Sequence, residues 1–242
     1  MNTIPQFINI PVTFVIGASQ FVSIGGVANA ASYQTGAAPG MLMYVSGSGL
    51  SSSSQLQIAQ NVPLPFSIGG VSATVNGVPA PIYYTLLDQM VIQVPYETPA
   101  GSALLAVNEN GRVATYFFTV YPSVPGIFVD SNNQLVPTGT AQRGSSLAFF
   151  MTGEGDVTGG LATGSSPSTS IPVNQLPAPR GQFSMTVGGI SVTPLFVGIP
   201  YGLVGVTQVN FTVPANVPTG LQNVVVNVGG YKSVAAKLNI TP

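Results

Sequence analysis

The segment Gln89-Met-Val-Ile-Gln-Val-Pro95, followed by Thr98-Pro-Ala-Gly101, recurs as Gln208-Val-Asn-Phe-Thr-Val-Pro214, followed by Val217-Pro-Thr-Gly220. Each copy is a short run rich in apolar and β-branched residues that ends at a proline and a glycine-containing turn. This pattern is typical of a β-strand. A duplicated series of such strands predicts two copies of one β-sandwich.

Similar short apolar runs continue along the chain on both sides of the first copy. The pair Asn110-Gly111 between two such runs predicts a β-hairpin with a tight turn. No stretch has the sustained helical periodicity and the caps that indicate a helix. The strands predicted in the first half are Met41–Ser46, Val71–Asn76, Ile82–Leu87, Met90–Val94, Ala103–Asn108 and Val113–Tyr121.

These patterns predict an all-β protein with two tandem Ig-like β-sandwich domains after an N-terminal extension strand. We expect the extension at residues 1–23, the first domain at 24–121 and the second at 122–242. Residues 157–181 are rich in Gly, Ser, Thr and Pro and predict a long loop in the second domain. Such a loop is usually docked on a neighbour or mobile, and Thr163–Ser170 would also suit O-glycosylation.

The N-terminal residues 4–16 have the alternation of a β-strand. Pro5 and Pro11 both have odd numbers and lack an N–H, so this strand can pair fully along one edge only. A signal peptide and a membrane-spanning helix are the alternatives, but no Lys or Arg precedes the apolar stretch and the prolines interrupt a helix. The apolar residues of even number, which share one face, are Ile4, Ile8, Ile10, Val12, Phe14 and Ile16.

Low charge is the most informative feature of the composition. The 242 residues include five basic and six acidic residues, and neither cysteine nor histidine. So few basic residues exclude nucleic-acid binding and polybasic attachment to anionic lipid. A neutral surface does little to keep copies of a protein apart. The composition therefore indicates either a neutral secreted domain or a subunit whose surface is covered by other copies.

Acidic residues do not form a pattern that catalysis or metal binding requires. Glu154 and Asp156 lie in a glycine-rich turn, and two carboxylates fall short of the six to eight oxygens of a calcium site. We expect a solvated turn there, and surface positions for Asp88, Glu97 and Glu109. With isolated acids and no histidine base, the sequence predicts no enzymatic activity, no metal and no cofactor.

The ordered series of motifs resembles one known family. Asn29-Ala-Ala-Ser-Tyr33, Gly47-Ser-Gly-Leu50, the stretch from Gly69 to Pro81, and Pro125-Gly-Ile-Phe128 are similar to the Solibacter-type C-terminal module of acidobacterial secreted proteins. The resemblance covers about residues 27–242. It implies secretion, an Ig-like or TIG-like β-sandwich and no catalytic residues. This chain departs from the family at Gly153-Glu-Gly-Asp156, where a neutral residue is usual, and it lacks a large upstream region.

The sequence favours an extracellular structural subunit that assembles into a homopolymer, in the form of a filament, tube or sheet. The strand at residues 4–16 would be donated to a neighbouring subunit, or it would fold back on its own first domain. The alternative function is a cell-surface adhesin or carbohydrate-binding module, secreted in either case, with surface glycans as partners. The tyrosines that could stack on a sugar are Tyr33, Tyr44, Tyr83, Tyr84 and Tyr201.

Overall fold

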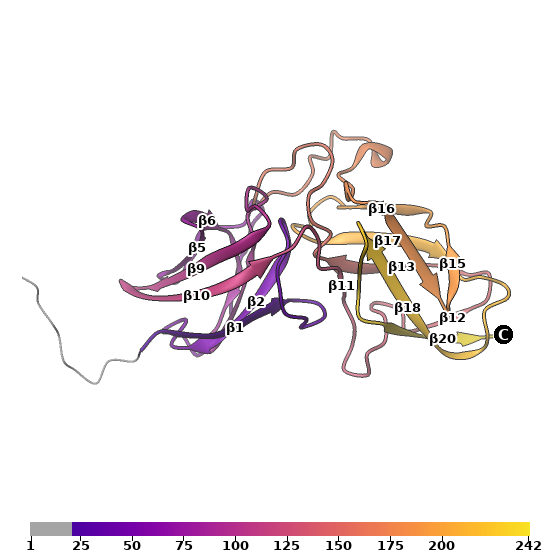
Figure 1. Ribbon diagram of the computed structural model, residues 1–242, viewed down its shortest axis with the longest axis horizontal. Helices are drawn as coiled ribbons and strands as arrows, with labels where there is room; N and C mark the ends of the chain where they lie inside the picture. Colours follow the sequence, from indigo (N-terminus) through magenta and orange to yellow (C-terminus); the bar gives the residue numbers. More distant parts are fainter. Residues whose placement is uncertain (1–20) are drawn as a thin grey trace, which may run out of the picture.

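The computed structural model describes residues 21–242, which form two β-sandwiches joined end to end (Figure 1). Each sandwich consists of two sheets that enclose their own apolar core. The sequence prediction of tandem Ig-like β-sandwiches is confirmed. The expected extension strand at residues 4–16, with its row from Ile4 to Ile16, lies outside the described residues.

The first sandwich is built from the strands before Tyr121. One sheet has, in spatial order, β1 (Ser23–Asn29), β2 (Leu42–Ser48), β8 (Gln89–Gln93), β7 (Ile82–Thr85) and β3 (Gln57–Ile58). The other has β10 (Arg112–Val120), β9 (Gly101–Glu109), β5 (Val71–Val75) and β4 (Ser67–Ile68), with β6 (Val78–Ala80) also paired to β5.

The second sandwich repeats this arrangement. Its first sheet has β11 (Gly126–Ile127), β13 (Ser146–Thr152), β17 (Thr207–Thr212) and β16 (Phe196–Gly198). Its second sheet has β12 (Thr140–Gln142), β20 (Ala236–Thr241), β18 (Gly220–Val228), β14 (Phe183–Val187) and β15 (Ile190–Val192), with β19 (Tyr231–Lys232) paired to β18. A short 3-10 helix, η1, covers Val173–Gln175.

The repeated motif explains why the two sandwiches match. Its first copy forms β8 and its second copy forms β17, and both strands are central in their sheets, beside β2 and β13 respectively. Inward-facing side chains of these strands, such as Ile92 and Phe211, are fully buried. The predicted hairpin is confirmed, because Glu109 pairs with Arg112 across the Asn110-Gly111 turn.

Buried hydrogen bonds join the two sandwiches. The Thr152 hydroxyl accepts from the Leu42 amide at 2.9 Å and donates to the Gly205 carbonyl at 2.6 Å. The Asn29 side-chain amide donates to the Val124 carbonyl at 2.7 Å and to the Thr152 carbonyl at 3.3 Å. Because buried hydrogen bonds of this kind are costly to break, they fix the two sandwiches relative to each other.

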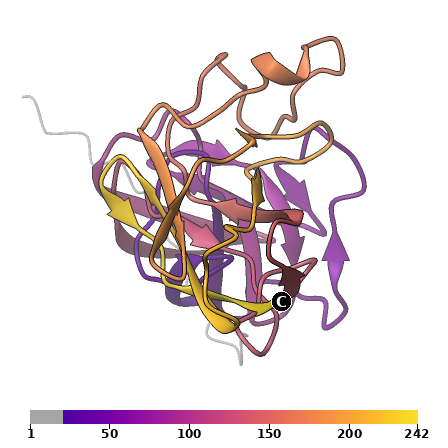
Figure 2. The same ribbon diagram turned by 90° about the vertical axis from the view of Figure 1, so that its right-hand side faces the viewer.

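The long loop at residues 157–181 runs along the side of the molecule and reaches from the second sandwich to the first (Figures 1 and 2). Gly164 donates its amide to the Gln93 side chain at 2.6 Å, and its carbonyl accepts from the Leu64 amide at 2.8 Å. The Thr163 hydroxyl accepts from the Tyr96 amide at 3.1 Å. This part of the loop is docked on the first sandwich of its own chain.

Candidate functional site

Most of the outer edge of β10 is not paired with another strand within residues 21–242. β10 lies at the end of its sheet and pairs with β9 along all nine of its residues. The tight turn at Asn110-Gly111 makes Arg112 and the other even-numbered residues of β10 the ones bonded to β9. The odd-numbered residues Val113, Thr115 and Phe117 therefore direct their N–H and C=O groups away from β9.

Within residues 21–242, only the last part of this edge is hydrogen-bonded to another segment. The Ala37 amide donates to the Thr119 carbonyl at 3.0 Å, and the Tyr121 amide donates to the Ala37 carbonyl at 2.8 Å. This contact is a parallel bridge, and Ala37 itself is fully buried in the core. From Val113 to Phe117 no other described strand is paired with the edge.

The side chains along β10 leave this edge unprotected. Phe117 is 73% exposed and Val113 is 60% exposed, and both lie on the outer face of the sheet. Natural sheet edges are usually blocked by proline, by charged residues or by a covering segment. β10 contains no proline, and Arg112 at its start is its only charged residue. An exposed apolar edge of this kind favours the addition of another strand.

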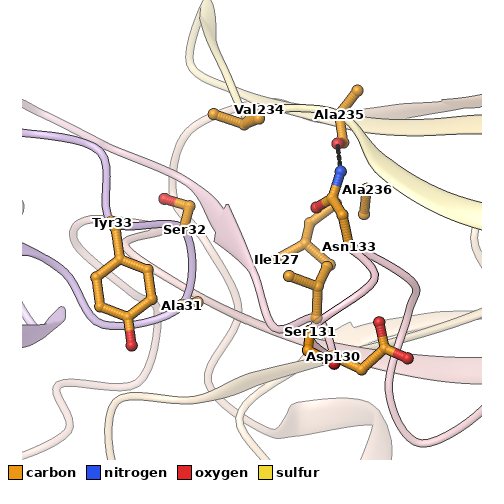
Figure 3. Close-up of a pocket in the computed structure, with 11 residues that line it drawn as sticks. Ala31, Ser32, Tyr33, Ile127, Asp130, Ser131, Asn133, Val234, Ala235 and Ala236 are labelled. Carbon is orange, nitrogen blue, oxygen red and sulfur yellow. Dashed lines mark hydrogen bonds between the residues drawn. The ribbon is translucent and has the colours of Figure 1, made fainter.

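A second candidate site is a cleft between the two sandwiches, with a volume of about 440 Å³ (Figure 3). Ser32 and Tyr33 of the first sandwich form one wall, and Ile127 and Asn133 of the second form the other. The carboxylate of Asp130 turns away from Tyr33, and one of its oxygens accepts the amides of the next turn. Asp130 is the only charged residue among those that line the cleft.

Asn29 holds the turn that carries Tyr33. Its side-chain oxygen accepts from the Ala31 amide at 2.8 Å and from the Ser32 amide at 3.2 Å. The Asn29 carbonyl accepts from the Tyr33 amide at 2.9 Å. Tyr33 has a φ of 56°, an uncommon conformation for a bulky residue, and it is 67% exposed. The same buried Asn29 thus fixes both this turn and the junction of the sandwiches.

Of the five tyrosines singled out in the sequence, three come together. Tyr44 and Tyr84 both pair with Val91, from opposite sides, so they share the outer face of that sheet. The Tyr33 ring meets the Tyr44 ring edge to face, with the ring centres 5.4 Å apart. Burial and the neighbouring phenols raise the pKa of Tyr84. Tyr33, Tyr44 and Tyr84 form what we call the tyrosine cluster.

The other two tyrosines lie elsewhere. Tyr83 lines a hollow beside Ile58 and Val62, and Tyr201 lines an apolar groove of the second sandwich with Val173 and Leu195. The Tyr201 hydroxyl donates to the Ile171 carbonyl. Neither ring takes part in the tyrosine cluster.

The prediction of a solvated turn at Glu154 is wrong. Gly153 and Gly155 have φ values of 88° and 81°, and a Cβ at either position would lie 2.0 Å from a carbonyl of the linker, at Val124 and Pro122 respectively. Only glycines allow the turn to pack this closely, and Glu154 between them is buried at the junction.

Burial raises the pKa of Glu154 to about 8, although the Thr207 hydroxyl and the amides of Gly153 and Glu154 partly oppose this shift. These groups lie near the carboxylate, but neither of its oxygens makes a hydrogen bond of ordinary geometry within residues 21–242, and the same is true of the Tyr96 hydroxyl. Burial, followed by the charges of Glu154 and Asp156, also raises the pKa of Tyr96. Asp156, by contrast, is exposed and forms an ion pair with Arg180.

The surface position expected for Glu109 is also wrong. Glu109 is fully buried and forms an ion pair with Arg112, and the Asn110 side chain donates to it at 2.7 Å. Burial would raise the pKa of Glu109, but the hydrogen bonds from Arg112, Asn110 and Ser52 outweigh it and lower the pKa. The pair is structural, since it closes the β9–β10 hairpin.

The described part of the chain offers neither a metal-binding cluster nor a membrane-spanning helix. Residues 21–242 contain no group of three or more acidic, histidine or cysteine side chains placed to hold a metal ion. They also contain no helix of the length and apolarity needed to span a membrane.

The alternation of apolar and polar residues from Val113 to Phe117 is visible in the sequence. The Asn110-Gly111 turn fixes that the odd-numbered residues direct their backbone N–H and C=O groups away from β9. The sequence could not show that β10 is an edge strand, because sheet order depends on contacts between distant segments. Asn29 and Asn133, which hold the two walls of the cleft, carried no signal distinct from other turn asparagines.

A scan against family models finds no match, and a search of curated proteins finds none either. Among solved structures, plexin A4 has 9% identity and a TM-score of 0.30, and the match covers 93% of this chain and 19% of plexin. SGBP-B of Bacteroides ovatus, solved with a mixed-linkage heptasaccharide, has 12% identity and a TM-score of 0.25. The match covers 92% of this chain and 48% of SGBP-B. The titin Ig tandem A164-A165 has 9% identity and a TM-score of 0.23. The match covers 93% of this chain and 94% of the titin tandem. The chain thus spans less than half of the first two, and similarities this distant say nothing about its function.

Proposed function

We propose that this chain is an extracellular structural subunit without catalytic activity that assembles into a homopolymer. Each subunit donates the strand at residues 4–16 to a neighbouring subunit. The observation that carries this proposal is the edge of β10: between Val113 and Phe117 its backbone has no partner strand within residues 21–242, and two of its apolar side chains are exposed. An added strand would satisfy those backbone groups and cover the apolar surface.

The energetics favour association. Burying the six apolar side chains of residues 4–16 would contribute roughly 9–18 kcal/mol before the ordering costs, which remove a large part of it. The low charge of the chain adds little repulsion between copies.

Negative-stain electron microscopy and light scattering on the full chain and on a chain lacking residues 1–20 test this function. We expect polymers from the full chain and folded monomers from the truncated one, with equal melting temperatures for the monomeric fold. A full chain that stays monomeric at all concentrations would overturn the proposal. A truncated chain that melts much earlier would show instead that the strand folds back on its own domain.

A second function, binding of a neutral glycan, is favoured by the tyrosine cluster. Tyr33 is held exposed at the mouth of the cleft, and aromatic rings beside hydroxyl and amide groups suit the flat apolar faces and hydroxyls of sugars. This function is compatible with assembly, because the tyrosine cluster lies on the other sheet from β10.

Affinity electrophoresis in gels that contain a soluble neutral polysaccharide, such as hydroxyethylcellulose or dextran, tests the second function. We expect retardation of the wild type, loss of retardation in Tyr33→Ala and no change in Tyr83→Ala, which removes a tyrosine outside the cluster. Equal migration of all three proteins in every gel would contradict glycan binding.

A further inference from the structure

We infer that the donated strand adds to β10 of the neighbouring subunit in the parallel direction, so that its apolar row faces the inside of the acceptor sandwich. This inference rests on the proposed function and names the acceptor surface and the direction of the strand. Three features support it: the proline positions in the donor, an equivalent edge in the same molecule, and the places where β1 and β10 begin.

The prolines decide which backbone groups of the donor can pair. Alternate residues of a strand direct their N–H and C=O groups to the same side. Pro5 and Pro11 remove donors from the odd-numbered side, so the even-numbered residues must bond to β10. These are the residues that carry the apolar side chains, from Ile4 to Ile16.

Strand direction then decides which face this apolar row occupies. In an antiparallel pair, bonded residues stand opposite each other and share a face, so the row would join Val113 and Phe117 on the outer face. In a parallel pair, a bonded residue stands opposite an unbonded one, so the row would lie beside Ala114 and Tyr116 on the inner face. Both of these inner residues are only half-buried in the isolated chain. The parallel direction alone places the even-numbered face, which is apolar except for Gln6, inward and the mixed face toward solvent.

In the second sandwich, a segment of the same chain pairs with the equivalent edge in the parallel direction. β20 occupies the position that β10 has in the first sandwich, and residues 133–142, which we call the covering segment, run parallel to it. Lys237 donates its amide to the Asn133 carbonyl at 2.8 Å, and Leu135 donates its amide to the Lys237 carbonyl at 2.9 Å. Leu135, a bonded residue of the covering segment, is buried in the core.

At Ala37, too, a residue that is bonded to the edge in the parallel direction directs its side chain into the core. Ala37 is bonded to Thr119 and Tyr121 in a parallel bridge, and its side chain is buried in the first core. A parallel donor strand would extend this bridge toward the start of β10. It would give Val113, Thr115 and Phe117 the partners that the covering segment gives to β20.

The positions of β1 and β10 agree with an open polymer. Both strands begin at the end of the first sandwich that lies farther from the second (Figure 1). A parallel donor would finish near the junction of the acceptor, so the far end of one subunit would meet the junction of the next. This head-to-tail contact is heterologous, and a heterologous contact continues as an open polymer when its rotation does not close a ring. An antiparallel donor would bring two far ends together, which favours a closed pair with exchanged strands.

Disulfide trapping between single-cysteine chains tests the inference, because the natural chain has no cysteine. Donor chains carry Asn9→Cys or Thr13→Cys, and acceptor chains carry Val113→Cys, Thr115→Cys, Phe117→Cys or Thr119→Cys. Each donor is mixed with each acceptor before assembly, oxidised mildly and run on a non-reducing gel. Gln6→Cys, a polar position of even number, is the matched donor control.

We expect both odd-numbered donors to form crosslinked dimers with the acceptors, and Gln6→Cys to form few. The best acceptor for Thr13→Cys should lie four residues closer to Thr119 than the best acceptor for Asn9→Cys. A shift toward Val113, or crosslinks from Gln6→Cys in place of the odd donors, would show an antiparallel strand. Polymers that depend on residues 1–20 but crosslink at none of these positions would overturn the inference and leave the proposed function standing. A chain without polymers would instead refute the proposed function itself.

Discussion

The two sandwiches share one strand order but differ at one edge. In the second sandwich the covering segment is hydrogen-bonded to the edge of β20, and its residue Leu135 is buried in the core. Within residues 21–242, the corresponding edge of β10 in the first sandwich is hydrogen-bonded only at its end, to Ala37. Within the described residues, the same topology is therefore complete in one copy and open at β10 in the other. We propose that a strand of a neighbouring subunit completes the first copy.

The comparison can be tested most strongly with one proline at each edge. Asn239→Pro removes an amide that donates to the Gly139 carbonyl at 2.9 Å, so we expect it to destabilise the monomer by about 2–3 kcal/mol. Thr115→Pro removes an amide that faces the open edge, so it should leave the fold intact and abolish polymers.

Urea unfolding of the chain without residues 1–20 measures the stability of both variants, and light scattering on the full chain measures assembly. Strong destabilisation by Thr115→Pro, comparable to that of Asn239→Pro, would mean that the edge of β10 is already paired within its own chain.

Side-chain truncation at the two edges should separate folding from assembly. Leu135→Ala empties a buried position of the covering segment, and we expect it to lower the free energy of unfolding by about 2–5 kcal/mol. Phe117→Ala removes an exposed side chain, so it should change that free energy by less than about 0.5 kcal/mol and weaken assembly. Thermal unfolding and sedimentation of the two variants give the comparison. A large loss of stability in Phe117→Ala would contradict it.

The stability that the junction between the sandwiches contributes should depend on pH, whereas assembly through the β10 edge should not. Glu154 has a pKa of about 8 in the folded chain and an ordinary value of 4.5 when unfolded. Between these values the unfolded chain releases a proton that the folded chain keeps. The contribution of Glu154 is therefore complete below about pH 4.5 and is lost as the pH rises to about 8.

Unfolding free energies of the wild type and of Glu154→Gln, measured from pH 5 to pH 9, test whether the contribution of Glu154 to stability falls as the pH rises. We expect the wild type to lose stability relative to the variant as the pH rises, with assembly through β10 unchanged because Arg112 is the only charged residue of that strand. Parallel curves for the two proteins would show that Glu154 does not titrate in this range.

The repeat, the turns and the alternation in the sequence were sufficient to predict two β-sandwiches and the β9–β10 hairpin. They depend on local patterns that the printed residues carry. Sheet order was not predictable in the same way, so the difference between the β10 and β20 edges emerged only from the structure. The tyrosine cluster was also hidden, because Tyr33 is brought to Tyr44 by a turn that Asn29 stabilises from the junction.

The errors at Glu109 and Glu154 have a common physical cause. Charged residues beside glycines in turns are usually solvated, and the sequence offered no reason to expect otherwise. Glu109 is buried because Arg112 pairs with it across the hairpin. Glu154 is buried because its flanking glycines let the turn pack against the linker. Both contacts are tertiary or pairing effects that composition and spacing do not reveal.

Amide hydrogen exchange along β10 tests the central claim most directly. In polymers of the full chain we expect slow exchange at Val113, Thr115 and Phe117, and in the chain lacking residues 1–20 we expect fast exchange at the same three amides. The amides of Lys237 and Asn239, which the covering segment already bonds, should be slow in both. Equal exchange of the three β10 amides with and without residues 1–20 would contradict the account.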